Sequence, residues 1–377
     1  MTVDTDFKIQ LLTLSRVVGI GAARLRVLVQ HFGTAERVLA ASAAELGNVE
    51  GIGESLARSI VGFSRGAEKV KASEAATKQL ELAEKFQASL ITLWDENYPA
   101  MLREIYDPPA YFFMRGSLTA EDEQGLAIVG TRYPTEYGKN AAKRLVEELA
   151  PHGFTIVSGL AYGIDSVAHT AAIQNRTRTI AVLGSGTDII YTDPKGILYP
   201  KIIEQGAIIS EEWMGAAPVA ENFPKRNRII SALSQGTVII ESDLKGGAMI
   251  TAKYAMEQNR EVFAVPGSIF SKKSRGTNAL IRDSGAKLVM SAEDILNELR
   301  PKLRFPSGST ATKVERALPE MTDDESKLYS FLQDEPVHID ELALQSGLDI
   351  SDVLVLLFEL EMKECITQLP GKFFQKR

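Results

Sequence analysis

The middle of the chain alternates short Val- and Ile-rich runs with glycine-rich turns and helical stretches. Seven such runs lie at residues 126–129, 154–157, 179–183, 207–209, 238–240, 262–265 and 287–290. They are continuously apolar and do not alternate with polar residues, which is typical of strands that are covered on both faces. Strands of this kind separated by helices predict an α/β fold with a doubly wound, mostly parallel, extended Rossmann-like sheet.

An approach segment precedes this sheet and is expected to extend it. Residues 67–87 have a charged, helical pattern, and residues 89–93 and 110–114 have the composition of strands, with a turn and two prolines between them. We therefore assign residues 67–300 to one extended Rossmann-like domain.

Residues 1–66 are helical in pattern and contain an internal repeat. The run Gly19-Ile20-Gly21 returns as Gly51-Ile52-Gly53, about 32 residues later. Each copy predicts a helix, a tight glycine turn and a second helix whose first backbone N–H groups can hold a phosphate oxygen. This arrangement resembles the helix-hairpin-helix (SAM-like) module of non-specific DNA-binding proteins. A plain helical hairpin that only packs is the alternative, because the local charge is close to neutral.

The end of the chain has a pattern of its own. Residues 301–320 have little apolar content and predict a flexible linker. In residues 321–377, Thr322 and Glu325 form a predicted capping box. Helices are expected over 325–332, from 338 and over 350–361, followed by a strand-turn-strand over 366–374. This order predicts a small winged-helix domain.

Composition and charge exclude several classes of protein. With 45% hydrophobic and 24% charged residues, the chain of 377 residues can build a large core. The absence of a long apolar run and of a secretory signal predicts a cytoplasmic protein without a membrane partner. The single Cys365 excludes an internal disulfide framework, and the histidines lack metal-ligand spacing. We expect no metal, no cofactor and no catalytic residue.

The net charge of −7 argues against a nucleic-acid partner only superficially. Residues 301–377 carry 9 basic and 14 acidic residues, so most of the acidic excess lies there. The remainder is nearly neutral and can carry a local basic patch, which matters more to a polyanion than the total. The acidic C-terminal segment favours a protein partner or a regulatory role.

Candidate ligand-binding residues follow the strands, because ligands of such sheets bind beyond the carboxyl ends of the strands. Small side chains there let a backbone approach a ligand closely, and helix N-termini supply N–H donors. Several such turns side by side suit an anion with more than one phosphate. The candidates after the first two strands are Gly130, Thr131, Arg132, Ser158, Gly159, Leu160 and Gly163.

A cationic run, Lys225, Arg226, Asn227 and Arg228, stands where a helix is predicted to begin. Cations are unfavourable at that end of the helix dipole, and a bound phosphate would resolve the conflict. Alternatively, an arginine pairs with an acidic residue inside the fold. We expect one arginine to be structural and the other cations to be available. Helical spacing places Lys225 and Arg228 on one side and Arg226 on another.

Rival sites are poorly supported. The first turn lacks the Gly-x-Gly-x-x-Gly fingerprint of dinucleotide sites, and the chain has neither a phosphate-binding P-loop motif nor a Gly-x-Ser-x-Gly motif. Asp165 and His169 lie one helical turn apart. They are expected to cap and pack their helix and not to catalyse a reaction.

Several of these stretches together resemble DNA-processing protein A, the DprA/Smf family. The matching stretches, in the order of the family, are residues 127–132, 158–165 with 168–169, 179–184, 223–230, 250–252 and 265–267. The resemblance implies a non-enzymatic protein that binds single-stranded DNA and protects incoming strands in natural transformation. It also implies that the protein helps to load the RecA recombinase and forms a homodimer through its α/β domain.

The resemblance also assigns individual residues. Arg132 matches the phosphate-binding arginine of the family. Lys195 stands where the family commonly has Asn, and it can take over a phosphate contact. Gly247 belongs to a Gly-Gly pair where Ser-Gly is usual. The alternative function is a nucleotide or nucleoside-monophosphate hydrolase on a related fold, whose phosphate loop has its nearest counterpart in residues 266–268.

Overall fold

The computed structural model describes residues 4–299, 321–332, 337–363, 365–369 and 372–376. Its contacts divide the chain into two compact units, Met1–Leu303 and Arg304–Arg377. The linker predicted over residues 301–320 lies outside the described residues.

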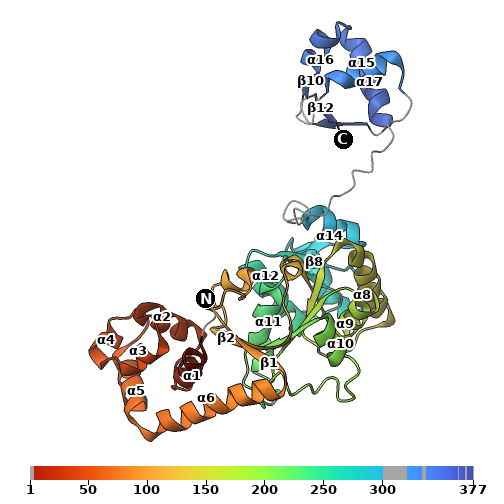
Figure 1. Cartoon of the computed structure of the whole chain (residues 1–377). Coiled ribbons are helices and arrows are strands. Elements are labelled where there is room, and N and C mark those ends of the chain that lie inside the picture. The colour runs from red at the N-terminus through yellow and green to blue at the C-terminus, as the bar shows by residue number, and fades with distance from the viewer. Residues whose placement is uncertain (1–3, 300–320, 333–336, 364, 370–371, 377) are drawn as a thin grey trace. The chain divides into compact units, whose positions relative to one another are not determined.

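The larger unit consists of a helical N-terminal part and a nine-stranded sheet with helices on both faces (Figure 1). Its α-helices are α1 Thr5–Leu14, α2 Ala22–Phe32, α3 Ala35–Ala40, α4 Ala43–Gly47, α5 Glu54–Arg65, α6 Ala67–Lys85, α7 Ala100–Arg103, α8 Glu136–Leu149, α9 Ile164–Gln174, α10 Tyr199–Gln205, α11 Asn222–Ala232, α12 Gly247–Glu257, α13 Arg275–Arg282 and α14 Ala292–Leu299. Its strands are β1 Ala88–Thr92, β2 Tyr111–Gly116, β3 Gly125–Val129, β4 Thr155–Ser158, β5 Thr179–Leu183, β6 Gly206–Ser210, β7 Gly236–Ile239, β8 Glu261–Ala264 and β9 Lys287–Leu288.

The strand order is β1-β2-β6-β5-β4-β3-β7-β8-β9. The seven strands from β6 to β9 in this order pair in parallel, whereas β2 pairs antiparallel with both β1 and β6. The prediction of a doubly wound, mostly parallel sheet extended by the approach segment is therefore confirmed. The strand order reverses between β3 and β7, and such a switch point is where open α/β sheets form a ligand crevice.

The central strands are buried on both faces, as their continuous apolar runs predict. On one face, alternate residues such as Ala127 and Val182 pack against α11 and α12. On the other face, the intervening residues such as Ile128 and Val238 pack against α8, α9 and α14. Figure 1 shows α11 and α12 on one side of the sheet and α8, α9 and α10 on the other.

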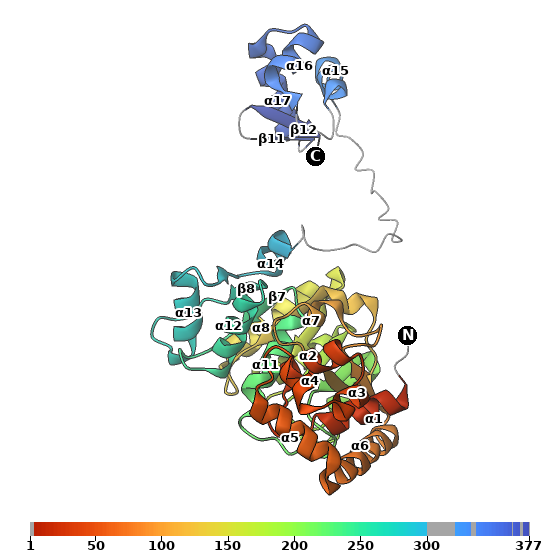
Figure 2. The same cartoon turned by 90° about the vertical axis from the view of Figure 1, so that its left-hand side faces the viewer.

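The N-terminal helices, which lie toward the viewer in Figure 2, have their own core but also contact the edge of the sheet. Leu12 of α1 and Ala76 of α6 pack with Phe113 of β2. Gln79 of α6 exchanges two hydrogen bonds with the backbone of Met214, at 3.3 and 2.7 Å. The boundary that we propose at residue 66 lies at Gly66, between α5 and α6, within one compact unit.

The smaller unit contains α15 Asp323–Phe331, α16 Ile339–Ser346 and α17 Ile350–Met362, with strands β10 Val337–His338, β11 Ile366–Leu369 and β12 Phe373–Lys376. The strands form an antiparallel sheet in the order β10-β12-β11. The predicted capping box of Thr322 and Glu325 is present at the start of α15. Three helices followed by a hairpin confirm the predicted winged helix.

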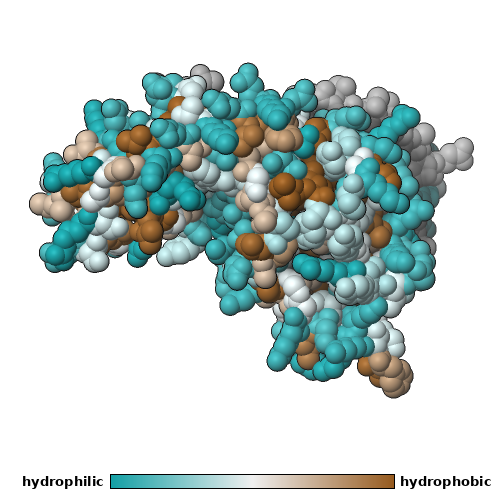
Figure 3. Space-filling model, turned by 90° about the horizontal axis from the view of Figure 1, so that it is seen from below, coloured by the Kyte–Doolittle hydropathy of each residue, from teal (hydrophilic) through white to brown (hydrophobic). Residues whose placement is uncertain are grey.

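Within the described residues, none of the helices has the length and apolar character needed to span a bilayer. The face drawn in Figure 3 is mainly hydrophilic, with hydrophobic residues in separate small groups.

Candidate functional site

A cleft of about 660 Å³ lies at the carboxyl ends of β3 and β7, where the strand order reverses. The turn after β3, the segment leading into α11 and the first turn of α12 form its walls. Residues from all of these segments line it, namely Val129, Gly130, Thr131, Arg132, Tyr133, Ala161, Asp165, Pro218, Ala220, Phe223, Pro224, Arg226, Asn227, Ile230, Ser242, Asp243, Gly246, Gly247, Ala248, Ile250 and Thr251.

The turn after β3 is anchored from β7 and leaves its arginine exposed. The backbone N–H of Thr131 donates to the carbonyl oxygen of Glu241 at 2.8 Å, and the Glu241 carboxylate accepts from the Thr135 N–H at 2.8 Å and hydroxyl at 2.6 Å. Arg132 is exposed, and its guanidinium lies 5.3 Å from the ring centroid of Phe223. An anchored turn therefore presents an exposed cation at the rim of the cleft.

The turn after β4 supports the cleft from behind. Ser158 is fully buried, and its hydroxyl donates to the carbonyl oxygen of Ile128 at 2.6 Å. Leu160 is buried with φ of 50°, a strained conformation for a branched side chain. Gly163 begins α9 with φ of 86°, and a Cβ there would collide with the carbonyl oxygen of Thr131. Ser158, Gly159 and Leu160 are therefore placed to shape the turn, and they do not line the cleft.

Arg226 forms the cationic floor of the cleft. It is 7% exposed, and its guanidinium donates to the carbonyl oxygens of Gly159, at 2.7 Å, and Val182. Burial lowers the pKa of Arg226, the carboxylate of Asp165 opposes this shift, and the charge of Arg132 adds to it. The two arginines therefore repel each other across the cleft.

The rest of the basic run differs from the sequence-based expectation. Lys225 is exposed, but Arg226, Asn227 and Arg228 are all buried. Arg228 donates to both carboxylate oxygens of Glu211, at 3.0 and 2.9 Å, and does not line the cleft. The expectation that only one arginine is structural is therefore wrong. Arg226 packs against carbonyl oxygens, and Arg228 is the one that pairs with carboxylates.

Asn227 and Gly247 meet at the side of the cleft. The Asn227 amide lies 3.4 Å from the carbonyl oxygen of Gly247, which is the first residue of α12. Gly246, the N-cap residue of α12, offers no side-chain cap, and Gly246, Gly247 and Ala248 line the cleft, so this helix end has N–H groups without a side-chain cap at the cleft wall. A Cβ at Gly247 would meet nothing within 4 Å, whereas a Cβ at Gly246, the position where Ser is usual in the family, would collide with the Ser242 hydroxyl. Lys195 is exposed in the loop after β5, outside the cleft lining.

Sequence reasoning missed an aromatic cluster beside the cleft. The ring of Tyr191 lies 6.4 Å from that of Tyr162 and 5.9 Å from that of Phe223, both nearly edge to face. The Tyr162 hydroxyl also donates to the carbonyl oxygen of Tyr191. Tyr133 at the cleft rim is 80% exposed. These residues come from separate turns, and only their aromatic character close to predicted strand ends signals them.

Asp165 and His169 are buried and pack α9 as expected. Asp165 accepts hydrogen bonds from the backbone N–H groups of Gly159 and Ala161, at 3.1 and 3.4 Å. Burial raises the pKa of Asp165, and Arg226 opposes that shift. The Asp165 carboxylate therefore holds the turn after β4, and it does not cap α9, whose N-cap is Gly163.

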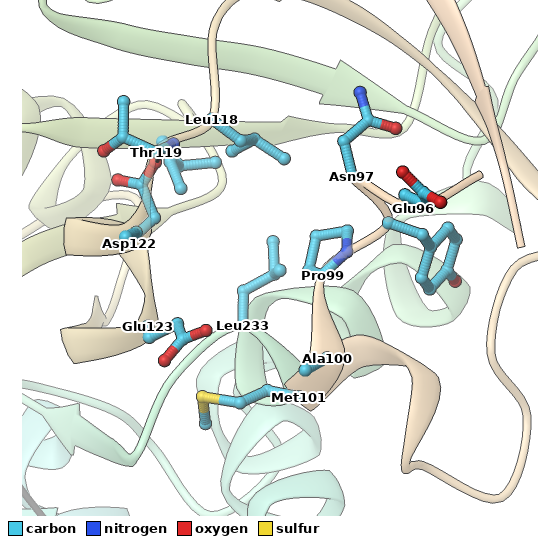
Figure 4. A pocket seen from close by; sticks show the side chains of 13 residues that line it. Glu96, Asn97, Pro99, Ala100, Met101, Leu118, Thr119, Asp122, Glu123 and Leu233 are labelled. Carbon is cyan, nitrogen blue, oxygen red and sulfur yellow. Dashed lines mark hydrogen bonds between the residues drawn. The ribbon is translucent and has the colours of Figure 1, made fainter. Parts of the chain in front are cut away.

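A second pocket, of about 340 Å³, lies at the amino ends of β3 and β5 (Figure 4). Its side chains include Leu118 and Leu233 together with the carboxylates of Glu96, Asp122 and Glu123, and no Lys or Arg is among the residues that line it. Such a lining repels phosphate groups. The cleft with Arg132 and Arg226 is therefore the better candidate for an anionic ligand.

Comparison with known protein families matches three segments of the chain. Residues 89–300 match the family described as DNA recombination-mediator protein A, and residues 312–372 match the DprA winged helix domain. Residues 11–71 match a helix-hairpin-helix motif. The first two matches name one family, and together the three cover most of the chain.

Individual proteins and solved structures point the same way. The chain is 34% identical over 397 residues to Protein Smf from Synechocystis, covering 97% of this chain and 98% of that protein. It is 43% identical over 210 residues to DNA processing protein DprA from Bacillus subtilis, covering 55% and 70%. The X-ray structure of DNA processing protein A from Streptococcus pneumoniae matches with a TM-score of 0.55 and 33% identity, over 74% of this chain and 98% of that one.

A second solved structure has a title that names a ligand. It describes the unique single-stranded DNA binding mode of DNA processing protein A from Helicobacter pylori. It matches with a TM-score of 0.52 and 32% identity, over 58% of this chain and 98% of that chain.

Proposed function

The chain belongs to the DprA/Smf family of DNA recombination-mediator proteins, and we propose that it binds single-stranded DNA in the cleft between β3 and β7. The observation that carries this proposal is that Arg132 and Arg226 both line the cleft, where the positive charge of Arg132 repels that of Arg226 and helps to lower its pKa. A backbone phosphate between them removes that repulsion. The single-stranded DNA named for the Helicobacter pylori relative gives independent support.

The elements around the pair suit a flexible strand. The uncapped start of α12 offers N–H groups to a further phosphate. Tyr133, with Tyr162, Tyr191 and Phe223, offers aromatic faces and edges on which unpaired bases can stack, whatever their sequence. Bases within a duplex are already stacked and cannot use these rings. We therefore propose binding with little sequence preference and a preference for single strands over duplex.

Lys225 is exposed between the lining residues Pro224 and Arg226, and Lys195 is exposed in the loop that carries Tyr191. Both are proposed to contact phosphates further along the strand. Gly130, Thr131, Asn227 and Gly247 line the cleft and are proposed to contact the strand there. Ser158, Gly159, Leu160 and Gly163 are proposed to act by holding the turn. Arg228 is left out of this proposal because it pairs with Glu211.

The binding proposal is tested by titrating a labelled oligonucleotide and its duplex with the full chain over a range of salt concentrations. Three to four phosphate contacts predict a slope of log affinity against log salt of about −2 to −3 for the single strand. Equal affinity for the duplex, or an affinity that does not change with salt, would contradict the proposal.

Arg132→Ala should weaken binding of single-stranded DNA by about 1.5–3 kcal/mol, because it removes one charge-assisted phosphate contact. Arg132 is exposed, so the melting temperature should remain close to that of the parent. The matched control is Arg144→Ala, which removes an exposed arginine from α8, outside the cleft. Affinities measured by fluorescence anisotropy should separate the two variants, and equal affinities would remove Arg132 from the site.

The biological role that we propose is non-enzymatic. The protein would protect incoming single strands in the cytoplasm during natural transformation and help to load the RecA recombinase onto them. We base this role on family membership and on the state of Asp165 in the cleft. Its buried carboxylate already accepts hydrogen bonds from backbone N–H groups and so holds the turn after β4. A strand-exchange assay with RecA on DNA coated by a single-strand binding protein tests this role, and no stimulation would contradict it.

We also propose a homodimer formed through the edge of the sheet at β9. An open edge strand offers unpaired backbone groups to a second copy. Exposed apolar side chains lie in or near this edge, including Leu288 and Met290, with Ile269 and Phe270 (93% exposed) in the loop after β8. A second copy that covers this edge would remove these side chains from water.

Leu288→Glu combined with Met290→Glu should convert the dimer to a monomer in light scattering, because it would bury two carboxylates at the centre of the contact. Val70→Glu introduces the same charge at an exposed apolar position on α6 and serves as the control. A double variant that keeps the mass of a dimer would contradict this surface.

A further inference from the structure

The exposed face of α17 in the winged helix is apolar. Phe358, Val355, Ile350 and Leu354 are 63, 57, 49 and 43% exposed, whereas Val353, Leu357 and Leu360 of the same helix are buried in the core of the unit. Ile350, Leu354 and Phe358 follow one another at intervals of four residues and so form one stripe along the helix. Contiguous exposed apolar side chains of this kind mark an interaction surface.

This helix occupies the place at which a winged helix normally reads DNA. It follows α16 across a tight turn at Gly347, and in a helix-turn-helix the second helix enters the major groove. Yet Ile350–Met362 contains no Lys or Arg and carries Asp352, Glu359 and Glu361. Lys363, directly after it, is held by the Glu325 carboxylate at 2.6 and 2.7 Å. A DNA backbone would be repelled by this helix.

We propose that the α17 stripe binds an amphipathic helix of a partner protein whose apolar side is bordered by Lys or Arg. The stripe supplies apolar side chains at i, i+4 and i+8 along one side of α17, against which the apolar side of a second helix can pack. Helical spacing places Glu361 between Ile350 and Leu354 within the stripe, while Asp352 and Glu359 lie beyond Val355 on the next side of the helix, so basic residues on the partner are complementary in charge.

A second copy of this unit is a less suitable occupant. Residues 321–377 carry twelve acidic and five basic residues. Two α17 helices packed stripe to stripe would bring their own Glu361 carboxylates together without cations. This repulsion is absent when the incoming helix is basic.

The test uses the full chain and designed peptides. Ser351→Cys places a thiol beside the stripe, and the only other cysteine, Cys365, is buried with a pKa raised by burial. An environment-sensitive dye attached to the thiol of the Ser351→Cys variant reports the binding of a helical, amphipathic Leu/Lys peptide. A scrambled Leu/Lys peptide and a Leu/Glu peptide with the same apolar side are the controls. We expect the amphipathic Leu/Lys peptide alone to saturate the signal.

Phe358→Glu in the same labelled chain gives the decisive comparison. It should weaken peptide binding at least about tenfold, because it removes a large apolar anchor. Purely electrostatic attraction predicts the opposite, since the variant adds a negative charge. Val70→Glu is the matched control, and both variants should keep the circular dichroism spectrum and the single-stranded DNA affinity of the parent.

Three outcomes would overturn the proposal. Equal or tighter peptide binding by Phe358→Glu would show that charge alone is responsible. Self-association that disappears in Phe358→Glu would assign the stripe to a second copy. Loss of DNA affinity in Phe358→Glu would assign it to nucleic acid. Failure of the cleft variants to change DNA binding, by contrast, would leave this inference unaffected.

Discussion

Arg228→Ala should lower the free energy of unfolding by about 3 kcal/mol, because it leaves a shielded carboxylate without its partner. Arg228 bonds both oxygens of Glu211 and lies 3.3 Å from an oxygen of Asp107. Burial raises the pKa of Glu211, and the charge of Arg228 is the largest opposing influence. The Glu211 side chain is 27% exposed. We therefore expect a loss of unfolding free energy at the lower end of the range of about 3–5 kcal/mol that is typical of breaking a buried ion pair.

Urea unfolding of the parent, Arg228→Ala and Lys225→Ala measures this effect. Lys225 is exposed on the same helix three residues earlier, so its removal should change stability by less than about 0.5 kcal/mol. Lys225→Ala should instead reduce the salt slope of DNA binding by about 1. Combining Arg228→Met with Glu211→Gln should recover part of the loss, since no charge then remains unpaired. A loss below about 1 kcal/mol for Arg228→Ala would contradict the structural role.

The basic run, Lys225 to Arg228, shows why the sequence alone assigned structural and ligand-binding roles to the wrong number of arginines. Spacing along an isolated helix places Lys225 and Arg228 on one side. The environment of Arg228, however, is set by Glu211 after β6 and by Asp107 in the approach segment, which are distant in sequence. Neither partner can be placed without knowing that β6 lies beside β2 and β5.

The fold was more accessible to prediction than the site. The central strands are local apolar runs such as 179–183, and parallel sheets require such runs, so these strands and their burial follow from the sequence. The last predicted run, 287–290, is an exception, because β9 covers only Lys287–Leu288 and is exposed at the edge of the sheet. The position of the cleft also follows from the carboxyl-end rule. The aromatic cluster was inaccessible, because Tyr162 and Tyr191 lie in two separate loops and Phe223 lies at the start of α11, and these segments meet only through the strand order.

The turn after β4 illustrates the same division. The sequence identifies its small residues and its helix start, but it assigns ligand contacts to Ser158 and Gly159. In the structure the Ser158 hydroxyl donates to the Ile128 carbonyl, and the Gly159 carbonyl accepts from Arg226. Neither group is therefore available to a ligand. A Cβ at Gly159 would meet the Arg226 guanidinium, so its glycine is required by packing behind the site.

His169 has a buried environment that disfavours its charged form. Its Nδ1–H donates to the Thr179 hydroxyl at 2.7 Å, since that hydroxyl donates in turn to the Ile156 carbonyl. Nε2 has no hydrogen-bond partner within the part of the chain that the structure describes. Burial, assisted by the positive charge of Arg226, lowers the pKa of His169 to about 3.

Acid should therefore destabilise the protein through His169, and His169→Gln should remove this part of the pH dependence. Above about pH 6.5 the histidine is neutral in both states, so its full contribution is present. As the pH falls below that value, the unfolded chain binds a proton that the native state refuses, and stability declines by up to about 1.4 kcal/mol per pH unit towards the folded pKa. Between about pH 6.5 and 4.5 the parent should lose roughly 2–3 kcal/mol more than His169→Gln.

Urea unfolding of both proteins across this pH range measures the difference in stability. The carboxylates that the two proteins share titrate equally in both, so their contribution cancels. The Gln amide can still donate to Thr179, which limits the packing loss at neutral pH. Parallel stability curves for the two proteins would show that His169 is protonated in the native state as readily as in the unfolded chain.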